Sequence, residues 1–541
     1  MILPPRPQNH RPLDRSRRTL DLPVTVDPPP PQNRPELDRF AVPPWNPRSP
    51  EWLAIEDSLP ADHRARAIDE AVDQLDLALL FASYLGVGSK AHRPDLMLKI
   101  ALYEIQTGHH SPDQWAKDTC DRRCLQWLGL GIAPSRSRWY AFRDRVGPLL
   151  ETFHRQILEG AVAQGLTTAS RGSLDGTLIA AHASRHRLVN LSRLRRRLEE
   201  LDRVIAADKT RQDPGPIPGW MARHPATRQR QRYRFREAQR KLLKEHARNA
   251  RRPRDQRQDA EKIVISTSDF QAALGRDKEK VFRPLYNLQV VQDIESPLVL
   301  GYEVFAQATD AGTLMPLRQR AHDLTGIWLK EILADAGYAS ALDLFDCAQA
   351  DVQLYAPYQE NDRTEQRRAQ RPQRQIPKSE FVWQAQEQVY VCPQGHRLTR
   401  ISQETRERAE GRTVEVRTYR CPKEHCQQCP LARRCTSSAK GRTIKRNEHE
   451  DLIVAHQAKM QTPEAKAIYR KRGQTVELRF ADAKAHRGLR RFSGRGLERV
   501  RIEVGLCPTN CENLVRCARF YNRFCGKVLE SRPSGSRRIA S

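Results

Sequence analysis

Hydrophobic residues recur at helical spacing over residues 56–165, where short amphipathic patterns follow one another. Leu96, Ile100 and Tyr103 lie four and three positions apart, which places them on one face of a helix. Ser111-Pro112 opens the next pattern as a capped helix does, since serine caps a helix and proline favours its first turn. The pattern therefore predicts an all-helical N-terminal domain.

Strand-like and helical segments alternate over residues 166–358. Two strand-like segments flank the turn Glu295-Ser296-Pro297 and so predict a hairpin. Three strands followed by helix, strand, helix and strand are typical of an α/β domain with a mixed sheet. We expect this core to resume over 456–525, with a long helix at 463–485 and an apolar helix near 506–521. The elements expected in its first part are strands at 172–179, 286–293, 298–305, 327–334 and 352–356 and helices at 311–324 and 339–349.

Two polar helical patterns separate the first strand from the rest of this core. Leucines repeat at helical spacing over 188–201, prolines over 214–218 break the pattern, and a second helix follows over 228–248. We expect a basic helical hairpin at residues 186–257. From Arg193 to Arg257 the chain has 21 Lys and Arg against 8 Asp and Glu. Because this segment concentrates so much of the net charge, we interpret it as a phosphate-binding arm rather than a solvated face.

Three further segments fit neither pattern. Residues 1–55 form a tail with 14 of the 36 prolines in its first 50 positions, and we expect it to be disordered. Residues 359–455 are charged, rich in glutamine and bear cysteines, so they predict a subdomain inserted into the core. Residues 526–541 form a short basic tail.

The composition of the 541 residues favours a polyanion as partner. The formal net charge is +28 and the sequence pI about 10.0, whereas only 6% of residues are aromatic, which argues against stacking on single-stranded bases. A mean hydropathy of −0.72 and the lack of a long apolar stretch predict no membrane span. Without a signal pattern we expect a cytoplasmic protein, whose cysteines are thiols or metal ligands in a reducing compartment.

Residues 135–143 predict a capped helix with Arg136 and Arg138 in its first turn. One interpretation is a helix that enters the major groove of DNA with these arginines at its start. The other is a solvated helix whose aromatic residues, Trp139 among them, belong to the core. Both interpretations fit the sequence.

Three acids stand where a metal site could form: Asp175 in the first strand, Asp335 at the end of a later strand, and Glu477 after the insertion. Clustered carboxylates bind Mg²⁺, and two ions about 3.5–4 Å apart stabilise the attacking and leaving oxygens of a phosphoryl transfer. Taken singly, an acid at such a position also fits a turn or a helix cap. The predicted site therefore depends on the three acids meeting in space.

The helix expected around Glu477 holds further candidates for binding phosphate. At 100° per residue, Lys484 is about 20° from Glu477 around the helix axis and Tyr469 about 80°. Arg472 is about 140° away, so it shares the face of Glu477 only if the helix begins or bends between them. We expect Lys484 to hold a phosphate beside the metal ions.

Several short motifs follow one another in a definite order. They are Asp175-Gly176-Thr177, Tyr286-Asn287-x-Gln289, Ala334-Asp335-Ala336-Gly337-Tyr338, and Tyr469-x-x-Arg472 with Glu477 and Lys484. In this order they resemble the motifs of bacterial insertion-sequence DDE transposases, in the branch with a Cys-bearing insertion before the catalytic Glu. The commonest form of the last motif has three residues between Arg and Glu, whereas four separate Arg472 from Glu477 here.

The resemblance covers about residues 65–520 and implies a ribonuclease-H-like catalytic domain. In it, Asp175, Asp335 and Glu477 would hold two Mg²⁺ ions, or Mn²⁺. The resemblance also implies binding of double-stranded DNA at transposon ends and target, cutting and joining of that DNA, and a homodimer on DNA at the bacterial nucleoid.

Cysteines in the insertion carry a second metal signal. Cys392-Pro393-x-Gly395-His396 precedes a Cys426-x-x-Cys429 pair and Cys435, and two cysteine arms with one such pair fit a structural zinc site. A closed site of this kind lets a segment with little core fold. We expect zinc at Cys392, Cys426, Cys429 and Cys435, with Cys421, His396 and His425 as substitutes. The alternative is a set of thiols without metal.

Together these features predict a transposase that binds terminal inverted repeats and uses Mg²⁺ for DNA cleavage and strand transfer. The first alternative is a catalytically silent DNA-binding regulator derived from such an enzyme, although the presence of all three acids argues against it. A metal-dependent nuclease without strand joining is the second. A zinc-stabilised RNA-binding protein comes last, because aromatic residues for stacking are scarce.

Overall fold

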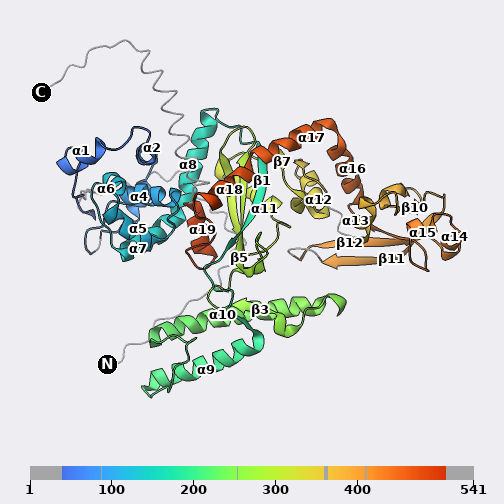
Figure 1. Cartoon of the computed structure of the whole chain (residues 1–541), viewed down its shortest axis with the longest axis horizontal. Coiled ribbons are helices and arrows are strands. Elements are labelled where there is room, and N and C mark those ends of the chain that lie inside the picture. Colours follow the sequence, from blue (N-terminus) through green and yellow to red (C-terminus); the bar gives the residue numbers. More distant parts are fainter. Residues whose placement is uncertain (1–38, 87, 253, 359–362, 408–410, 507–541) are drawn as a thin grey trace, which may run out of the picture.

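The computed structural model describes residues 39–86, 88–252, 254–358, 363–407 and 411–506. A central mixed sheet lies between an N-terminal helical domain and a strand-rich insertion, and a helical hairpin projects from one side (Figure 1). The α/β fold expected from the sequence is confirmed. No helix within the described segments combines the length and the apolarity that a membrane span requires.

The N-terminal domain is helical, as the hydrophobic spacing predicted. Its central helix, α4, is buried along its whole length. Trp115 and Trp139 meet edge to face at 5.6 Å in the same core. The helices are α1 (Pro50–Glu56), α2 (Arg64–Asp73), α3 (Ala78–Ala82), α4 (Pro94–Gln106), α5 (Pro112–Asp121), α6 (Arg123–Leu128), α7 (Arg136–Val146) and α8 (Leu150–Ala163).

Part of the expected disordered tail belongs to this domain. Residues 1–38 lie outside the described segments, but Phe40 packs edge to face on Phe81 at 5.4 Å. Trp52 of α1 stacks on Trp127 at 5.6 Å. The expectation of disorder through residue 55 is therefore wrong from about residue 40 onward, because these aromatic side chains find a buried surface among the helices.

The central sheet has the strand order β4-β5-β1-β7-β8, and β6 also pairs with β5. Strand β1 is antiparallel to β5 and parallel to β7, and β7 is parallel to β8. An antiparallel half that continues into a parallel half, with helices against it, fits the ribonuclease-H-like arrangement. The strands are β1 (Arg171–Ala180), β4 (Ala273–Arg276), β5 (Phe282–Asp293), β6 (Val299–Phe305), β7 (Glu331–Leu333) and β8 (Gln353–Tyr355).

The helices expected at 311–324 and 339–349 are confirmed, whereas α16 and α19 were not predicted and the long helix expected at 463–485 differs. That helix is broken: a 3-10 turn, Lys471–Gln474, separates α17 from α18, and Thr475 has φ −110° and ψ −104°. Gly473 and the β-branched Thr475 are weak helix formers, so a break costs little at this point. The apolar helix expected at 506–521 lies outside the described residues except for Leu506. The helices are α11 (Leu314–Thr325), α12 (Ala341–Gln349), α16 (Glu450–Gln461), α17 (Pro463–Arg470), α18 (Val476–Ala485) and α19 (Leu497–Gly505).

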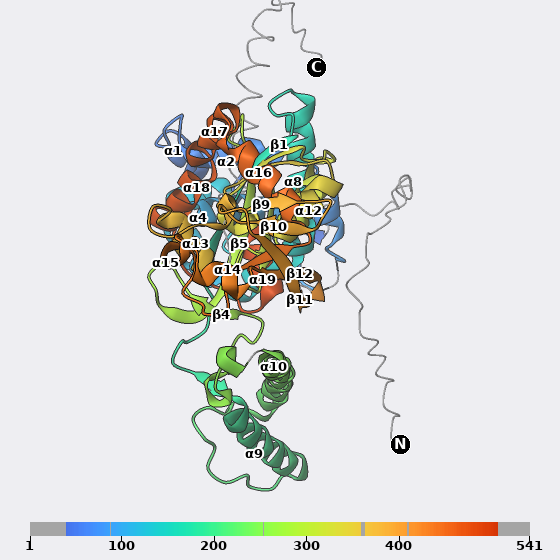
Figure 2. The same cartoon turned by 90° about the vertical axis from the view of Figure 1, so that its right-hand side faces the viewer.

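The basic segment forms the predicted helical hairpin. Helices α9 (Leu191–Thr210) and α10 (Pro225–Arg251) pack through their own small core, in which Leu198 and Phe235 are buried. The short antiparallel strands β2 (Leu188–Asn190) and β3 (Val264–Ser266) close its base. Figure 2 shows the hairpin extending away from the rest of the molecule, so most of its surface is open to a partner.

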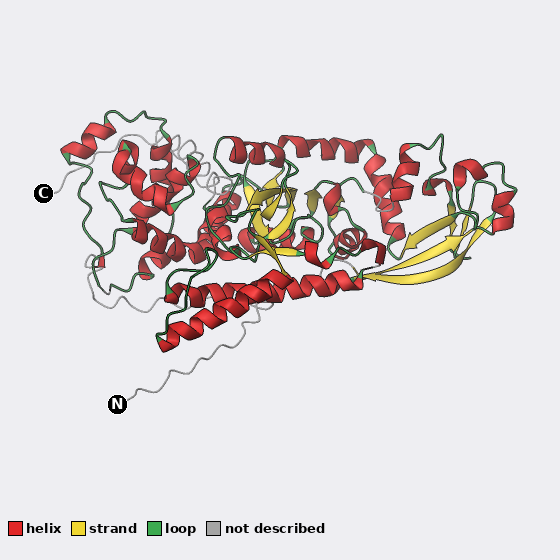
Figure 3. Ribbon diagram, turned by 60° about the horizontal axis from the view of Figure 1, so that its bottom comes forward, coloured by secondary structure: helices red, strands yellow, loops and turns green. Residues whose placement is uncertain are grey.

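The insertion folds around an antiparallel sheet of its own, with the strand order β13-β12-β11-β10-β9 (Figure 3). Tyr390, Leu398 and Tyr419 fill a small core on it. The cysteines lie at one end of this core. The strands are β9 (Val382–Gln384), β10 (Val389–Val391), β11 (Arg397–Glu407), β12 (Thr413–Arg420) and β13 (Thr443–Asn447), and the helices are α13 (Arg363–Gln370), α14 (Lys423–Gln427) and α15 (Ala432–Cys435).

Candidate active site

Asp175 and Asp335 reach the same level of the sheet because they follow paired residues on neighbouring parallel strands. Ser173 of β1 pairs with Leu333 of β7, and each acid stands two residues farther along its chain. Asp335 lies just past β7, where its Oδ1 accepts a backbone N–H of the short 3-10 helix Ala336–Tyr338 at 2.7 Å. Neighbouring strands are about 4.8 Å apart, so the register brings the two acids side by side.

Arg472 joins Glu477 to Asp175. Its Nη1 is 2.7 Å from Oε1 of Glu477, and its Nη2 is 3.2 Å from Oδ1 of Asp175. The break between α17 and α18 allows this arrangement, because Arg472 lies in the 3-10 turn instead of on the far side of a straight helix. The condition that the sequence set for Arg472, a helix that begins before Glu477, is thus met.

The electrostatics of the cluster favour an added cation. Burial raises the pKa of Asp175 to about 6, and the charge of Asp335 adds to the rise although Arg472 and Lys278 oppose it. A carboxyl with a raised pKa has too little positive charge nearby to stabilise its ionised form. The Glu477 side chain is 54% exposed, whereas that of Asp175 is only 14% exposed. The cluster is therefore open to solvent on the side of α18.

Tyr469 and Lys484 lie on α17 and α18, the helices on either side of the turn that holds Arg472. The pKa of Tyr469 is raised, mainly by burial and also by the charges of Asp335 and Glu477, so Tyr469 lies near these two acids. The pKa of Lys484 is lowered, mainly by burial and next by the positive charge of Lys278 in the turn between β4 and β5. Lys278 lies close enough to influence both Lys484 and Asp175, and nothing in its local sequence beyond its place in a turn points to such a role.

Two residues with side-chain amides are buried next to the cluster of acids. Asn287 and Gln289 of β5 are 1% and 0% exposed. Both donate from their side-chain amides to Oδ1 of Asp310, at 2.8 Å and 2.5 Å. The hydroxyl of Tyr338 donates to Oε1 of Gln289. Sequence reasoning assigned no role to Asp310, because the residues around it indicated only the start of a helix.

Two family models match the chain. One, described as a transposase domain (DUF772), matches residues 53–145, the region of helices α1 to α7. The other, described as a transposase DDE domain, matches residues 391–516 and so joins the insertion to Glu477 in one unit. The chain thus carries two transposase domains, one of them a DDE domain. Comparison of this transposase with curated proteins and with solved structures gave no significant match.

Four cysteines of the transposase insertion lie near one another. Burial raises the pKa of Cys421 to about 12, followed by the effects of Cys426, Cys392 and Cys435, so these three thiols are its neighbours. Backbone N–H groups point at two of the sulfurs, at 3.3 Å from Sγ of Cys392 and 3.5 Å from Sγ of Cys426. Cys421, expected only as a substitute ligand, is thus a member of the group, and Cys429 lies near enough to Cys435 to affect its pKa.

Helix α7 of the transposase has the buried aromatic residues of the second interpretation of residues 135–143, and the first interpretation stays a prediction. Trp139 and Phe142 are buried in the N-terminal core, as the second interpretation required. Arg136 and Arg138 are exposed in the first turn. Arg136 pairs with Asp113 at 2.8 Å, and Arg138 contacts Nε2 of His92 at 2.9 Å. The aromatic residues therefore serve packing, while the arginines stay on the surface.

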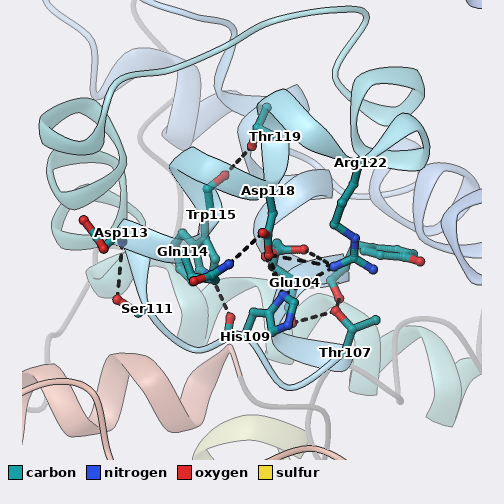
Figure 4. Close-up of polar contacts among 11 residues, drawn as sticks. Glu104, Thr107, His109, Ser111, Asp113, Gln114, Trp115, Asp118, Thr119 and Arg122 are labelled. Atoms are coloured by element: carbon teal, nitrogen blue, oxygen red, sulfur yellow. Dashed lines mark hydrogen bonds and ion pairs between the residues drawn. The ribbon is translucent and has the colours of Figure 1, made fainter.

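A second acidic cluster lies in the N-terminal domain (Figure 4). Nδ1 of His109 is 3.0 Å from Oε2 of Glu104 and 2.6 Å from Oδ2 of Asp118. Arg122 reaches the other oxygen of Glu104 at 2.8 Å, and Gln114 donates to Asp118 at 2.7 Å. No sequence pattern pointed to this cluster, because its members come from α4, α5 and the segments after them.

The acidic cluster of the N-terminal domain is the more tightly gathered one. Within the described segments, its three ligand atoms all lie within 4.8 Å of one another, and neither the acids around Arg472 nor the cysteines form such a group. Arg122 already supplies a positive charge to Glu104, so a metal ion there would meet repulsion. We interpret this cluster as a closed ion-pair network.

Proposed function

We propose that this transposase binds terminal inverted repeats and catalyses Mg²⁺-dependent cleavage and strand transfer of DNA through Asp175, Asp335 and Glu477. The observation that carries the proposal is the meeting of these acids at one end of β1 and β7, with Arg472 between Asp175 and Glu477. Along the chain these acids are 160 and 142 positions apart. A packing arrangement alone does not require acids at all three places.

The donor set fits divalent cations. Carboxylate oxygens are the ligands that Mg²⁺ and Mn²⁺ prefer, and the raised pKa of Asp175 fits a site short of positive charge. When bound, such ions lower the pKa of an attacking water or 3′-hydroxyl and stabilise the leaving oxygen. Asp335 is held in place by its contact with the backbone N–H of Gly337 at 2.7 Å. Arg472 offsets part of the negative charge of Asp175 and Glu477.

Cationic side chains around the cluster would hold the DNA backbone. Arg472 lies between Asp175 and Glu477, Tyr469 would add a hydroxyl near the acids, and Lys484 is our candidate for a phosphate beside the metal ions. Arg136 and Arg138 are exposed on α7 and suit contact with the duplex. The hairpin of α9 and α10 adds a basic arm that projects from the molecule. The enzyme would act as a homodimer that holds two transposon ends.

The cysteines would hold a structural Zn²⁺ ion. Cys392, Cys426 and Cys435 of the predicted set are gathered with Cys421. Backbone N–H groups near two of the sulfurs suit thiolates, because they stabilise the negative charge of a metal-bound sulfur. Metal analysis of the purified full chain should find one zinc, which Cys426→Ser lowers and Cys120→Ser, outside the insertion, does not. Cys429→Ser distinguishes the predicted ligand set from the set with Cys421.

The decisive experiment uses the full chain with DNA that carries the inverted repeats flanking its coding sequence. With Mg²⁺ we expect a nick that leaves a 3′-hydroxyl, followed by joining to target DNA. Salt-sensitive binding without nicking would instead indicate the silent regulator. Nicking without joining would indicate a nuclease.

The contribution of the basic arm is tested on the same DNA. Arg230 and Lys244 are exposed on α10. We expect Arg230→Ala with Lys244→Ala to weaken binding and to lower the slope of log K against log salt by about 0.9 for each phosphate that the variant no longer neutralises. The charge-conserving double variant, Arg230→Lys with Lys244→Arg, should keep the slope of the wild type. An unchanged slope in the alanine variant would remove α10 from the DNA interface.

A further inference from the structure

Asp310 places a fourth carboxylate at the catalytic cluster. It stands between β6 and α11, where the side-chain amides of Asn287 and Gln289 both hold its Oδ1, at 2.8 Å and 2.5 Å. Two buried amides that converge on one oxygen fix the direction of the whole carboxylate. The oxygen that they do not hold is Oδ2.

The Asp310 carboxylate, held by the two amides, lies close to Asp335 and to the neighbour of Asp175. A Cβ atom added to Gly337 would lie 2.9 Å from Oδ1 of Asp335 and 3.5 Å from Oδ2 of Asp310, so these carboxylates flank the same glycine. A Cβ atom added to Gly176, the neighbour of Asp175, would lie 2.7 Å from Oδ1 of Asp310. Glycine at both positions thus leaves the space in which three acids approach one another.

The charges of the three acids act together on the hydroxyl of Tyr338. Burial raises its pKa well above the ordinary value, and the charges of Asp310, Asp175 and Asp335 add to the rise. Glu477 brings a fourth negative charge, and Arg472 joins it to Asp175. Arg472 and the nearby Lys278 offset at most two of the four negative charges, which leaves an excess that divalent cations would offset.

We propose that Asp310 is a further ligand of the divalent ions at this site, through the oxygen that the amides leave free, and that Asn287 and Gln289 are its positioning residues. The inference rests on the proposed function, since it concerns the same ions. Hard cations take several oxygen ligands, and hydrogen bonds to a ligating carboxylate hold it in the orientation that binding needs.

The test compares Asp310→Asn with the wild type by calorimetric titration of the full chain with Mn²⁺ in the absence of DNA. Asparagine keeps an oxygen for the two amides and removes only the charge. We expect the Mn²⁺ affinity to fall about tenfold or more, with little change in Tm. Asp323→Asn, an exposed aspartate later on α11, is the matched control and should bind Mn²⁺ as the wild type does.

A double-mutant cycle tests the positioning role. Asn287→Ser removes one amide and leaves the carboxylate, so it should lower the Mn²⁺ affinity by less than Asp310→Asn. Combined with Asp310→Asn it should add almost nothing, because the two residues act through one ligand. Effects that add in full would mean that Asn287 acts independently and would overturn its role.

The outcomes distinguish a failure of this inference from a failure of the proposed function. If Asp310→Asn binds Mn²⁺ as tightly as the wild type does while Asp175→Asn no longer binds it, the role of Asp310 is overturned and the proposed function stands. A wild-type chain that binds no Mn²⁺ overturns both. Should Asp310→Asn fail to fold, Asn287→Ser decides, since it keeps the charge and disturbs only the orientation: an unchanged affinity there overturns the proposal.

Discussion

Two clusters of acids in this transposase each contain an arginine, and they differ in how much of their charge the chain itself neutralises. In the N-terminal domain, Glu104 and Asp118 face both His109 and Arg122, and Glu104 is fully buried. In the catalytic core, Arg472 is the cation in ion-pair contact with Asp175 and with the half-exposed Glu477.

The difference explains why proximity alone is a poor sign of a metal site. The N-terminal acids lie closer together, but Arg122 and the proton that Glu104 keeps below about pH 8 already offset their charge. The core acids are held farther apart and carry charge that the described side chains do not offset. Negative charge that the protein does not offset, together with access from solvent, is therefore the better criterion for a cation site.

The largest expected effect separates the clusters by activity. Asp175→Asn removes a charge from the open cluster, and we expect DNA cleavage to fall by at least about a thousandfold, since metal-ion stabilisation is worth several kcal/mol. Glu104→Gln should cleave at the wild-type rate below its Tm. A gel assay for nicked DNA, with circular dichroism to verify folding, measures both. Cleavage that survives in Asp175→Asn would contradict the assignment.

Exchanging Arg472 or Arg122 for methionine tests the difference between the two clusters further. Arg472→Met should lower cleavage about a hundredfold, by the loss of one preorganised charge, and cost about 1–3 kcal/mol of stability, because Arg472 and its partner Asp175 are only 11% and 14% exposed. Arg122→Met removes a charge-assisted hydrogen bond to buried Glu104 and should cost about 1.5–3 kcal/mol of stability without a direct effect on cleavage. Denaturant melts and the nicking assay measure the pair. The reverse pattern would show that the roles of the two clusters are exchanged.

Most of the candidate active site could be predicted from the sequence, for physical reasons that particular residues make clear. Alternating hydrophobicity around Asp175 and the strand before Asp335 predicted their places, and parallel register then brings them together. The position of Arg472 depended on whether the helix breaks near Gly473. A glycine and a β-branched residue permit such a break but do not require it, because the contact with Asp175 lies outside the local sequence.

The rest required contacts that no local pattern encodes. Asp310 and Lys278 come from connections between strands and helices, and only the fold brings them to the acids. Cys421 lies near the other cysteines because of the way β12 and the turn before β13 are arranged. The spacing of the cysteines along the chain does not reveal this proximity. The N-terminal cluster likewise joins residues whose own surroundings predict only helix ends.

Metal ions should stabilise only one of the two clusters. Mg²⁺ at 100 times its Kd adds about 2.7 kcal/mol to a folded state that alone binds it. We expect this gain in the wild type and in Glu104→Gln, and its absence in Asp175→Asn. Thermal melts with Mg²⁺ and with EDTA measure the difference. If Glu104→Gln also lacks the gain, the N-terminal cluster is itself a cation site and the comparison fails.

The smallest effect concerns the pH dependence of stability. Burial, followed by the hydrogen bond and charge of Asp118, raises the pKa of Glu104 to about 8 from an ordinary value near 4.5, although Arg122 opposes the rise. Because the folded state favours the protonated form, the stability from this group is complete below about pH 4.5 and is lost as the pH rises through about 8.

Replacing Glu104 by glutamine isolates this contribution, since glutamine cannot ionise. From pH 6 to pH 9 the wild type should lose on the order of 1–2 kcal/mol that Glu104→Gln retains, which corresponds to a few °C in the Tm of the N-terminal domain. Glu51→Gln, an exposed acid on α1, is the control and should follow the wild type. Parallel pH profiles for Glu104→Gln and the wild type would mean that Glu104 is ionised and fully paired with Arg122 at neutral pH. The N-terminal cluster would then hold a full salt bridge instead of a shared proton.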